Sequence, residues 1–187
     1  LFYGPTGVGK SLFADYLAVL IQEGYPHEGL AVEPGPGLIL DWEASREEIH
    51  ERVKAIQEGL GIEKGSGLRY RFCHQPLTSD IEQVQRIVVE EGIQFVVIDS
   101  AAPACGGQPE SAEATLQFFA ALRSLRITSM ILAHVPKNAS EKTPFGSYFW
   151  MAIPRSVYEL RKVQEAGSDM LHFGLFHRKV NTGRANH

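Results

Sequence analysis

The residues best suited to chemistry lie at the start of the chain, in the segment Gly4-Pro5-Thr6-Gly7-Val8-Gly9-Lys10-Ser11. A glycine, four further residues and then Gly-Lys-Ser is the spacing of a phosphate-binding loop. The glycines let successive backbone N–H groups curl around an anion, and a helix that begins near Lys10 would point its positive end at the same anion. Lys10 is expected to reach the β- and γ-phosphates of ATP, and the Ser11 hydroxyl to bind Mg²⁺. With Leu12, this segment is the predicted ATP site.

Carboxylates follow two of the predicted strands. Asp99 comes directly after the apolar residues 95–98, and we expect it to bind Mg²⁺ beside the loop. The next residue is Ser100, so a catalytic glutamate directly after the Mg²⁺ aspartate is absent. Glu43, at the carboxyl end of another strand, is the candidate that would hold or deprotonate the attacking water, and Asp41 is its rival.

Histidine and basic residues occupy the second half of the sequence. His134 ends an apolar strand, where its ring could contact the γ-phosphate and act as a sensor. Lys137 and Lys142 lie in the polar loop that follows, and they are candidates for contacts with a phosphate backbone. Late in the chain stand further basic residues that could act on a neighbouring subunit's nucleotide, namely Arg178, Lys179 and Arg184.

Strands and helices alternate along the chain. Short apolar runs predict buried strands at residues 1–3, 38–40, 93–99 and 129–133, with a weaker strand at 69–73. Periodic apolar residues predict helices at 12–23, from Ser45, and at 81–91 with a cap at 78–80. Ser45 and Glu48 have the spacing of a capping box. A further helix is predicted at 110–126, with Leu116, Phe119, Ala120 and Leu122 on one inner face. We predict a loop at 101–109, and antiparallel strands at 156–163 and 170–179. The order predicts an α/β fold: a mostly parallel central sheet flanked by helices, with antiparallel C-terminal strands.

Length and composition fit one globular domain spanning residues 1–187. We expect it to be a fragment truncated at both ends, because it begins at Leu1 and stops just after Arg184 with no closing element. The net charge of −4 excludes a whole-surface basic patch, so any nucleic-acid contact must be local. Cys73 and Cys105 have no metal-type spacing and are expected to be thiols in a reducing compartment. The absence of a long apolar run and of a signal peptide predicts a cytoplasmic protein with no membrane partner.

Together the phosphate loop, Glu43, Val97-Ile98-Asp99-Ser100 and Ala133-His134 resemble the RecA-like ATPases of the AAA_25 group. This group is typified by the RepA-type hexameric replicative helicases of plasmids and phages. Later motifs extend the resemblance over nearly the whole chain: Phe145-Gly146-Ser147, Arg155 and Lys179-Val180-Asn181-Thr182-Gly183.

The resemblance implies that Glu43 is the catalytic base, Asp99 the Mg²⁺ aspartate and His134 the γ-phosphate sensor. It implies a hexameric ring in which residues 135–147 face single-stranded DNA, and in which Lys179 and an arginine complete the neighbour's ATP site. Asn181 stands where helicase relatives have a second basic residue, so the arginine could be Arg178, Arg184 or Arg155.

The leading hypothesis is therefore the ATPase motor of a ring DNA helicase. The alternatives are a non-motor ATPase of RecA/KaiC type that acts in recombination or regulation, and a small-molecule kinase with the same loop. The kinase is the weaker alternative because the sequence has no arginine-rich lid.

Overall fold

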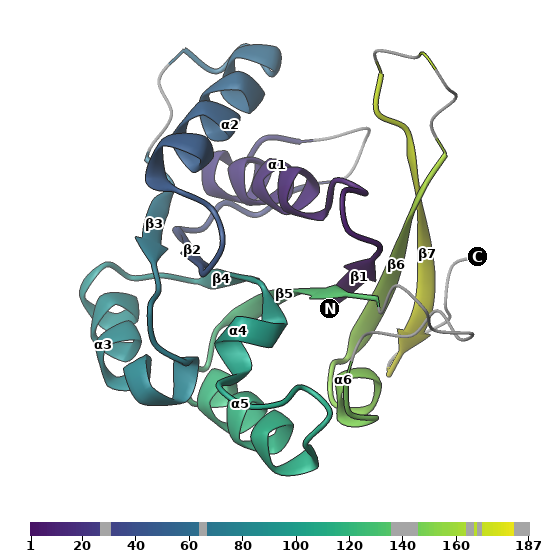
Figure 1. Cartoon of the computed structure of the whole chain (residues 1–187). Helices are drawn as coiled ribbons and strands as arrows, with labels where there is room; N and C mark the ends of the chain where they lie inside the picture. The colour runs from purple at the N-terminus through teal and green to yellow at the C-terminus, as the bar shows by residue number, and fades with distance from the viewer. Residues whose placement is uncertain (27–30, 64–66, 136–145, 164–166, 168–169, 182–187) are drawn as a thin grey trace.

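The computed structural model describes residues 1–26, 31–63, 67–135, 146–163, 167 and 170–181. Within these ranges, seven strands form one sheet in the order β3-β2-β4-β5-β1-β6-β7 (Figure 1). The strands are Phe2–Gly4 (β1), Gly37–Asp41 (β2), Arg69–Phe72 (β3), Phe95–Asp99 (β4), Thr128–His134 (β5), Ser156–Lys162 (β6) and Phe173–Val180 (β7). The helices are Lys10–Glu23 (α1), Arg46–Gly59 (α2), Leu77–Glu90 (α3), Ala101–Cys105 (α4), Ala112–Ser124 (α5) and Phe149–Ala152 (α6).

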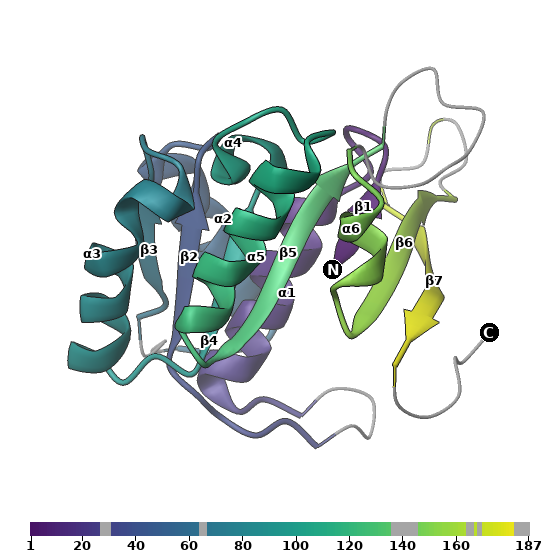
Figure 2. The same ribbon diagram turned by 90° about the horizontal axis from the view of Figure 1, so that it is seen from below.

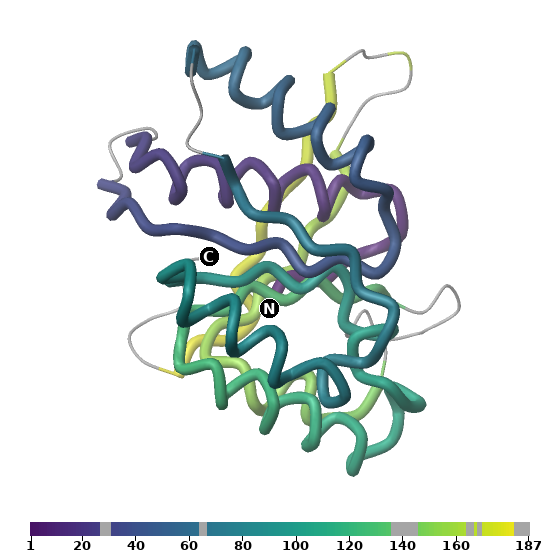
Figure 3. Tube along the Cα trace, turned by 90° about the vertical axis from the view of Figure 1, so that its left-hand side faces the viewer, coloured from purple at the N-terminus to yellow at the C-terminus, as the bar shows by residue number. Residues whose placement is uncertain are grey.

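All strand pairs are parallel except β6 with β7, which confirms the predicted fold class. Helices α1 and α2 cover one face of the sheet, and α3, α4 and α5 cover the other (Figures 2 and 3). Central strands are buried on both faces: Ile39 packs with α1, while Leu38 and Leu40 pack in the cluster on the opposite side. This two-sided burial explains the continuous apolar runs in the sequence.

Strand register brings the predicted site residues to one edge of the sheet. On β2 and β4, Asp41 lies opposite Asp99. On β1 and β5, Gly4 lies opposite His134. Since the strands are parallel, their carboxyl ends meet along this edge, and the phosphate loop and the acidic residues face the same space.

Helix α3 begins four residues earlier than predicted, and the predicted cap at residues 78–80 is wrong. Pro76 occupies the N-cap position, and residues 78–80 lie in the first turn. The Asp80 carboxylate is engaged elsewhere, because Arg71 donates to it from Nη2 at 2.7 Å and from Nε at 3.2 Å. This ion pair ties the edge strand β3 to α3.

The predicted loop at residues 101–109 is also wrong in part, because α4 occupies its first half. Pro103 does not prevent this helix, since it falls in the first turn, where its missing N–H would have no helical partner. The short helix packs on the same face of the sheet as α3 and α5, next to the carboxyl end of β4, and its Ala104 is fully buried.

Helix α5 is shorter than predicted, and half of its predicted inner face is wrong. Leu116 is exposed, whereas Phe118 is fully buried. The reason is Trp150 on α6, whose ring centroid lies 5.2 Å from those of both Phe118 and Phe119. The Trp150 indole N–H donates to the Pro109 carbonyl at 3.0 Å, so the short helix α6 is anchored on α5.

Cys73 and Cys105 are buried free thiols, as predicted. Among the helices within the described ranges, none combines the length and the apolar character needed to cross a bilayer.

A buried ion pair joins the two helices above the sheet. The Asp15 carboxylate on α1, only 1% exposed, lies 2.8 Å from Arg52 Nε on α2. Burial, helped by the nearby Asp99 and Asp41 carboxylates, nevertheless raises the pKa of Asp15 to about 7. Between the ordinary pKa and pH 7 the folded chain therefore holds a proton that the unfolded chain has lost, so this group makes folding less favourable as pH rises.

We therefore predict that Asp15→Asn flattens the dependence of stability on pH. As the pH rises from 5 to 8, the unfolding free energy of the wild type should fall by roughly 2 kcal/mol more than that of the variant. Urea denaturation at each pH measures both values. The matched control is Glu51→Gln, which removes an exposed carboxylate of α2 and should leave the slope unchanged. An identical slope in Asp15→Asn and wild type would contradict the assignment.

Candidate nucleotide site

The phosphate loop joins β1 to α1 and has the backbone conformation that an anion needs. Gly7 and Gly9 have φ of 75° and 93°, values that favour glycine. Val8, 2% exposed, anchors the loop in the core, while Pro5, Thr6 and Gly7 are exposed. No side chain caps the start of α1, so its first N–H groups are directed toward the loop without a side-chain acceptor.

Lys10 is held inside the loop by its own backbone. Its ammonium donates to the carbonyls of Gly4 at 3.0 Å and Pro5 at 2.9 Å. A third partner is His134 Nδ1, at 3.3 Å. The side chain is 6% exposed, and desolvation lowers the pKa of Lys10, although Asp99 and Glu43 act in the opposite direction. A bound phosphate would replace carbonyl partners with a full negative charge.

His134 links this lysine to the candidate base. Because an ammonium can only donate, its contact with Nδ1 requires that nitrogen to be the acceptor, so the ring proton sits on Nε2. Nε2 faces Glu43 Oε1 at 3.6 Å. The imidazole of β5 thus stands between the phosphate loop and the end of β2. Its role as a sensor of the γ-phosphate stays a prediction.

Glu43 is held from a second side by Ser100. The Ser100 hydroxyl, fully buried, donates to Glu43 Oε1 at 2.5 Å. These contacts, with His134 the largest contribution, lower the pKa of Glu43 to about 2. The carboxylate is nevertheless 52% exposed, so it is ionised, fixed in position and open to water. Sequence reasoning had treated Ser100 only as the absence of a glutamate.

Asp41, the rival carboxylate, has a different environment. It is completely buried, and its Oδ1 accepts hydrogen bonds from the backbone N–H groups of Glu43 at 2.6 Å and Ala44 at 2.8 Å. The Tyr70 hydroxyl donates to the Ala44 carbonyl at 2.9 Å and closes the turn from the other side. Asp41 therefore shapes the turn that carries Glu43, and the geometry favours Glu43 as the group that meets water.

The residues predicted to hold Mg²⁺ lie together. The Ser11 hydroxyl hydrogen-bonds to the Asp99 carboxylate, which is 7% exposed. Burial raises the pKa of Asp99 to about 6 in spite of this bond. An oxygen pair of this kind fits a Mg²⁺ ion that takes its other ligands from phosphate and water. In the part of the chain that the structure describes, no group of three or more His, Cys, Asp or Glu side chains could hold a metal ion unaided.

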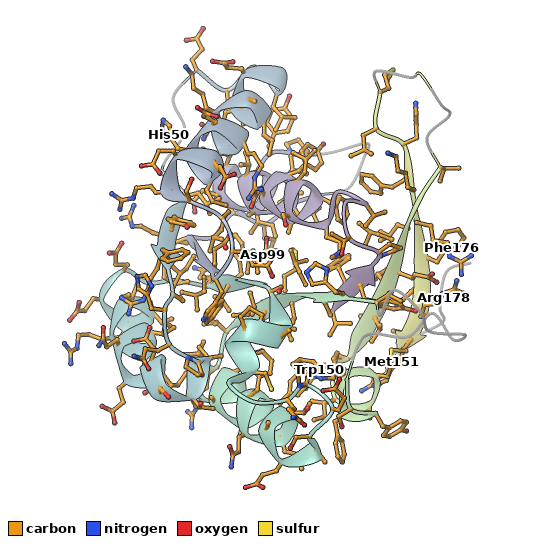
Figure 4. All side chains as sticks on the ribbon, viewed as in Figure 1. His50, Asp99, Trp150, Met151, Phe176 and Arg178 are labelled. Carbon is orange, nitrogen blue, oxygen red and sulfur yellow. The ribbon has the colours of Figure 1, made fainter. Side chains whose placement is uncertain are left out.

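Two of the basic residues predicted to act on a neighbouring subunit, Arg178 and Lys179, are engaged within their own chain. Arg178 donates from Nη2 to the buried Glu159 at 2.6 Å, on the outer hairpin and well away from Asp99 (Figure 4). Lys179 donates to the carbonyls of Ala152 at 2.5 Å and Pro154 at 2.7 Å. Arg155 is exposed directly before β6. Arg184, and with it the DNA-loop candidates Lys137 and Lys142, lie outside the described residues.

Comparison with known proteins agrees with this geometry. The sequence profile of the AAA domain family AAA_25 matches residues 1–140, so the chain belongs to this family of P-loop ATPases. A solved structure of similar fold is that of a KaiC-like protein from the hyperthermophilic archaeon Pyrococcus horikoshii OT3. It superimposes with a TM-score of 0.69 at 19% identity, covering 99% of this chain and 80% of that one. A search of curated proteins finds no match. Fold and site together define a RecA-like P-loop ATPase.

Amide substitutions can distinguish the roles of Asp41 and Glu43, the two carboxylates at the carboxyl end of β2. We expect Glu43→Gln to bind ATP normally but to lower turnover by about a hundredfold or more, because the water loses its charged partner. Asp41→Asn keeps an oxygen that can accept both backbone N–H groups, so turnover should stay within about fivefold of wild type. Steady-state ATPase rates and nucleotide binding test both variants. The opposite ranking would assign the base to Asp41.

Proposed function

We propose that this chain is the ATP-hydrolysing motor core of a RepA-like ring helicase that acts on single-stranded DNA. The observation that carries the catalytic part is the contact series Lys10, His134, Glu43 and Ser100 along the carboxyl edge of the sheet. It joins the loop expected to bind phosphate to the carboxylate expected to face water. Mg²⁺, held by Ser11 and Asp99, would supply charge neutralisation of the phosphates.

The same contacts suggest how ATP could control its own hydrolysis. A carboxylate whose pKa is about 2 can orient water but is a weak base. When the γ-phosphate draws Lys10 and the His134 ring toward itself, Glu43 loses the partner that lowers its pKa most. Its basicity then rises only after ATP has bound. Ser100 remains to keep the carboxylate in position.

Two features support the assignment to a DNA motor. The late motifs of the sequence, Phe145-Gly146-Ser147 and Lys179-Val180-Asn181-Thr182-Gly183, resemble those of RepA-type ring helicases. His134 also ends β5 directly before residues 135–147, the segment that the resemblance assigns to DNA binding. A change in the His134 contacts on hydrolysis would therefore shift the start of that segment. In a hexameric ring, Lys179 would leave its internal carbonyl partners to reach the neighbour's ATP. The accompanying arginine would be Arg178, which would have to leave Glu159, or the exposed Arg155, or Arg184.

A non-motor ATPase of RecA/KaiC type is the second candidate. The similarity to a KaiC-like protein over 99% of the chain favours it, because the ATP site described above would serve such a protein equally well. The two candidates differ in their response to DNA. Only a motor is expected to couple hydrolysis to movement along a strand.

We predict that single-stranded DNA stimulates the ATPase activity of the assembled protein and that the protein unwinds a forked duplex. Lys10→Ala should abolish both activities, because the phosphate loses its main cation; Lys162→Ala, at the end of β6, is the matched lysine control. ATP turnover with no response to DNA and no unwinding would favour the non-motor ATPase. Turnover that survives in Lys10→Ala would contradict the assignment of the site itself.

A further inference from the structure

Helix α6 has only four residues, and its position depends on contacts outside it. The Trp150 ring packs against Phe118 and Phe119 of α5, and its indole N–H donates to the Pro109 carbonyl at 3.0 Å. A helix this short has too few internal hydrogen bonds to be stable alone. The contacts of Trp150 and the partners of the terminal carbonyls therefore hold α6 in place.

Lys179 of β7 binds carbonyls at the end of α6. Its ammonium donates at 2.5 Å to the carbonyl of Ala152, the last residue of α6, and at 2.7 Å to the carbonyl of Pro154. A lysine at a helix C-terminus satisfies carbonyls that the helix leaves without an N–H partner. Figure 1 shows α6 next to the start of β6 and the end of β7, the two strands of the outer hairpin. Lys179 thus joins this hairpin to α6.

The two residues before α6 that the structure describes rest on the same contacts. The Ser147 N–H donates at 2.7 Å to the Pro109 carbonyl, which is also the acceptor of Trp150. Gly146 has φ of 126°, and a Cβ there would lie 2.5 Å from the Pro109 oxygen and 2.6 Å from Trp150 Nε1. Only glycine fits this position. Because Gly146 and Ser147 lie directly against Trp150 and its acceptor, a displacement of α6 would move them.

The bonds of Lys179 are of a kind that a phosphate can replace. Its acceptors are two neutral carbonyls, like those that Lys10 binds in the phosphate loop. An ammonium forms shorter and stronger hydrogen bonds with an anion than with a carbonyl. Arg178 differs, because its departure would remove one of the two guanidinium groups that pair with the buried Glu159 carboxylate. Of these two engaged cations, Lys179 is the easier to release.

We propose that Lys179 is a releasable cap on α6, which leaves the helix when it binds the triphosphate held by a neighbouring copy of this chain. Release would free the carbonyls of Ala152 and Pro154, loosen α6 and displace Gly146 and Ser147. Residues 135–147 begin directly after His134, which contacts the chain's own Lys10. The two ends of this segment would therefore respond to two different nucleotides. This inference rests on the proposed function, because it requires assembled copies that bind ATP.

Hydrogen exchange in the absence of nucleotide tests whether Lys179 holds α6. In Lys179→Met, which keeps an apolar stem of similar length, the Ile153 amide should exchange about tenfold faster or more. Its bond to the Phe149 carbonyl closes the last turn of α6, which loses its cap in this variant. Lys162→Met, at the exposed end of β6, is the matched control and should leave this amide unchanged. Unchanged exchange in Lys179→Met would contradict the cap.

Mixed assemblies test whether the neighbour's ATP releases the cap. Reporter subunits carry Lys10→Ala, which removes the main cation of their own ATP site, and fluorotryptophan in place of tryptophan. Their partners are unlabelled wild-type subunits. Fluorine NMR follows Trp150, whose resonance is the one that remains in a Trp42→Phe reporter. ATP with Mg²⁺ should shift this resonance in the mixture but not in reporter subunits alone, and the shift should vanish when the reporter also carries Lys179→Met.

The outcomes separate the cap from the proposed function. A mixture whose ATPase activity responds to single-stranded DNA while the Trp150 resonance stays unchanged would refute the cap alone. A shift that persists with Lys179→Met would show that the neighbour's ATP reaches α6 by another route, which would also refute the cap. Wild-type subunits that neither assemble nor respond to DNA would contradict the proposed function, and the release of the cap with it.

Discussion

The site depends on one imidazole that contacts both a cation and a carboxylate. His134 accepts from the Lys10 ammonium on one ring nitrogen and faces Glu43 with the other. Because Lys10 can only donate, the proton of the neutral ring is placed on the side of Glu43. In the proposed function, this ring would communicate the state of the phosphate loop to the carboxylate expected to meet water. The contact with Lys10 could not form if β1 and β5 were not neighbours in the sheet, with Gly4 opposite His134.

The rest of the site holds Glu43 in reach of that ring. Asp41 accepts both backbone N–H groups of the turn, and Ser100 holds the carboxylate from the neighbouring strand. All of these groups are at the carboxyl ends of parallel strands whose apolar runs are buried on both faces. The energetic role of the core is thus to fix strand order and register, and the register determines which polar side chains meet. Ionised Glu43 stays half exposed, which avoids the cost of burying an unpaired charge.

Much of this arrangement could be predicted from the sequence, and the exceptions have physical reasons. Apolar runs and the glycine spacing predict β4, β5 and the loop because burial and positive φ leave few alternatives. The capping box of Ser45 with Glu48 also formed as expected, with hydrogen bonds in both directions. The inner face of α5 was predicted wrongly because Trp150, distant in sequence, decides which of its residues are buried. Ser100 was missed because its role depends on strand order, which no local pattern encodes.

A double-mutant cycle measures directly whether His134 and Glu43 act as one unit in hydrolysis. Single-turnover hydrolysis of ATP would be followed in the wild type, His134→Ala, Glu43→Gln and the double variant. If His134 acts through Glu43, its removal should slow the wild type by about tenfold or more but the Glu43→Gln variant by less than about threefold. Losses that multiply in the double variant would show two independent contributions and would contradict the link on which the site is built.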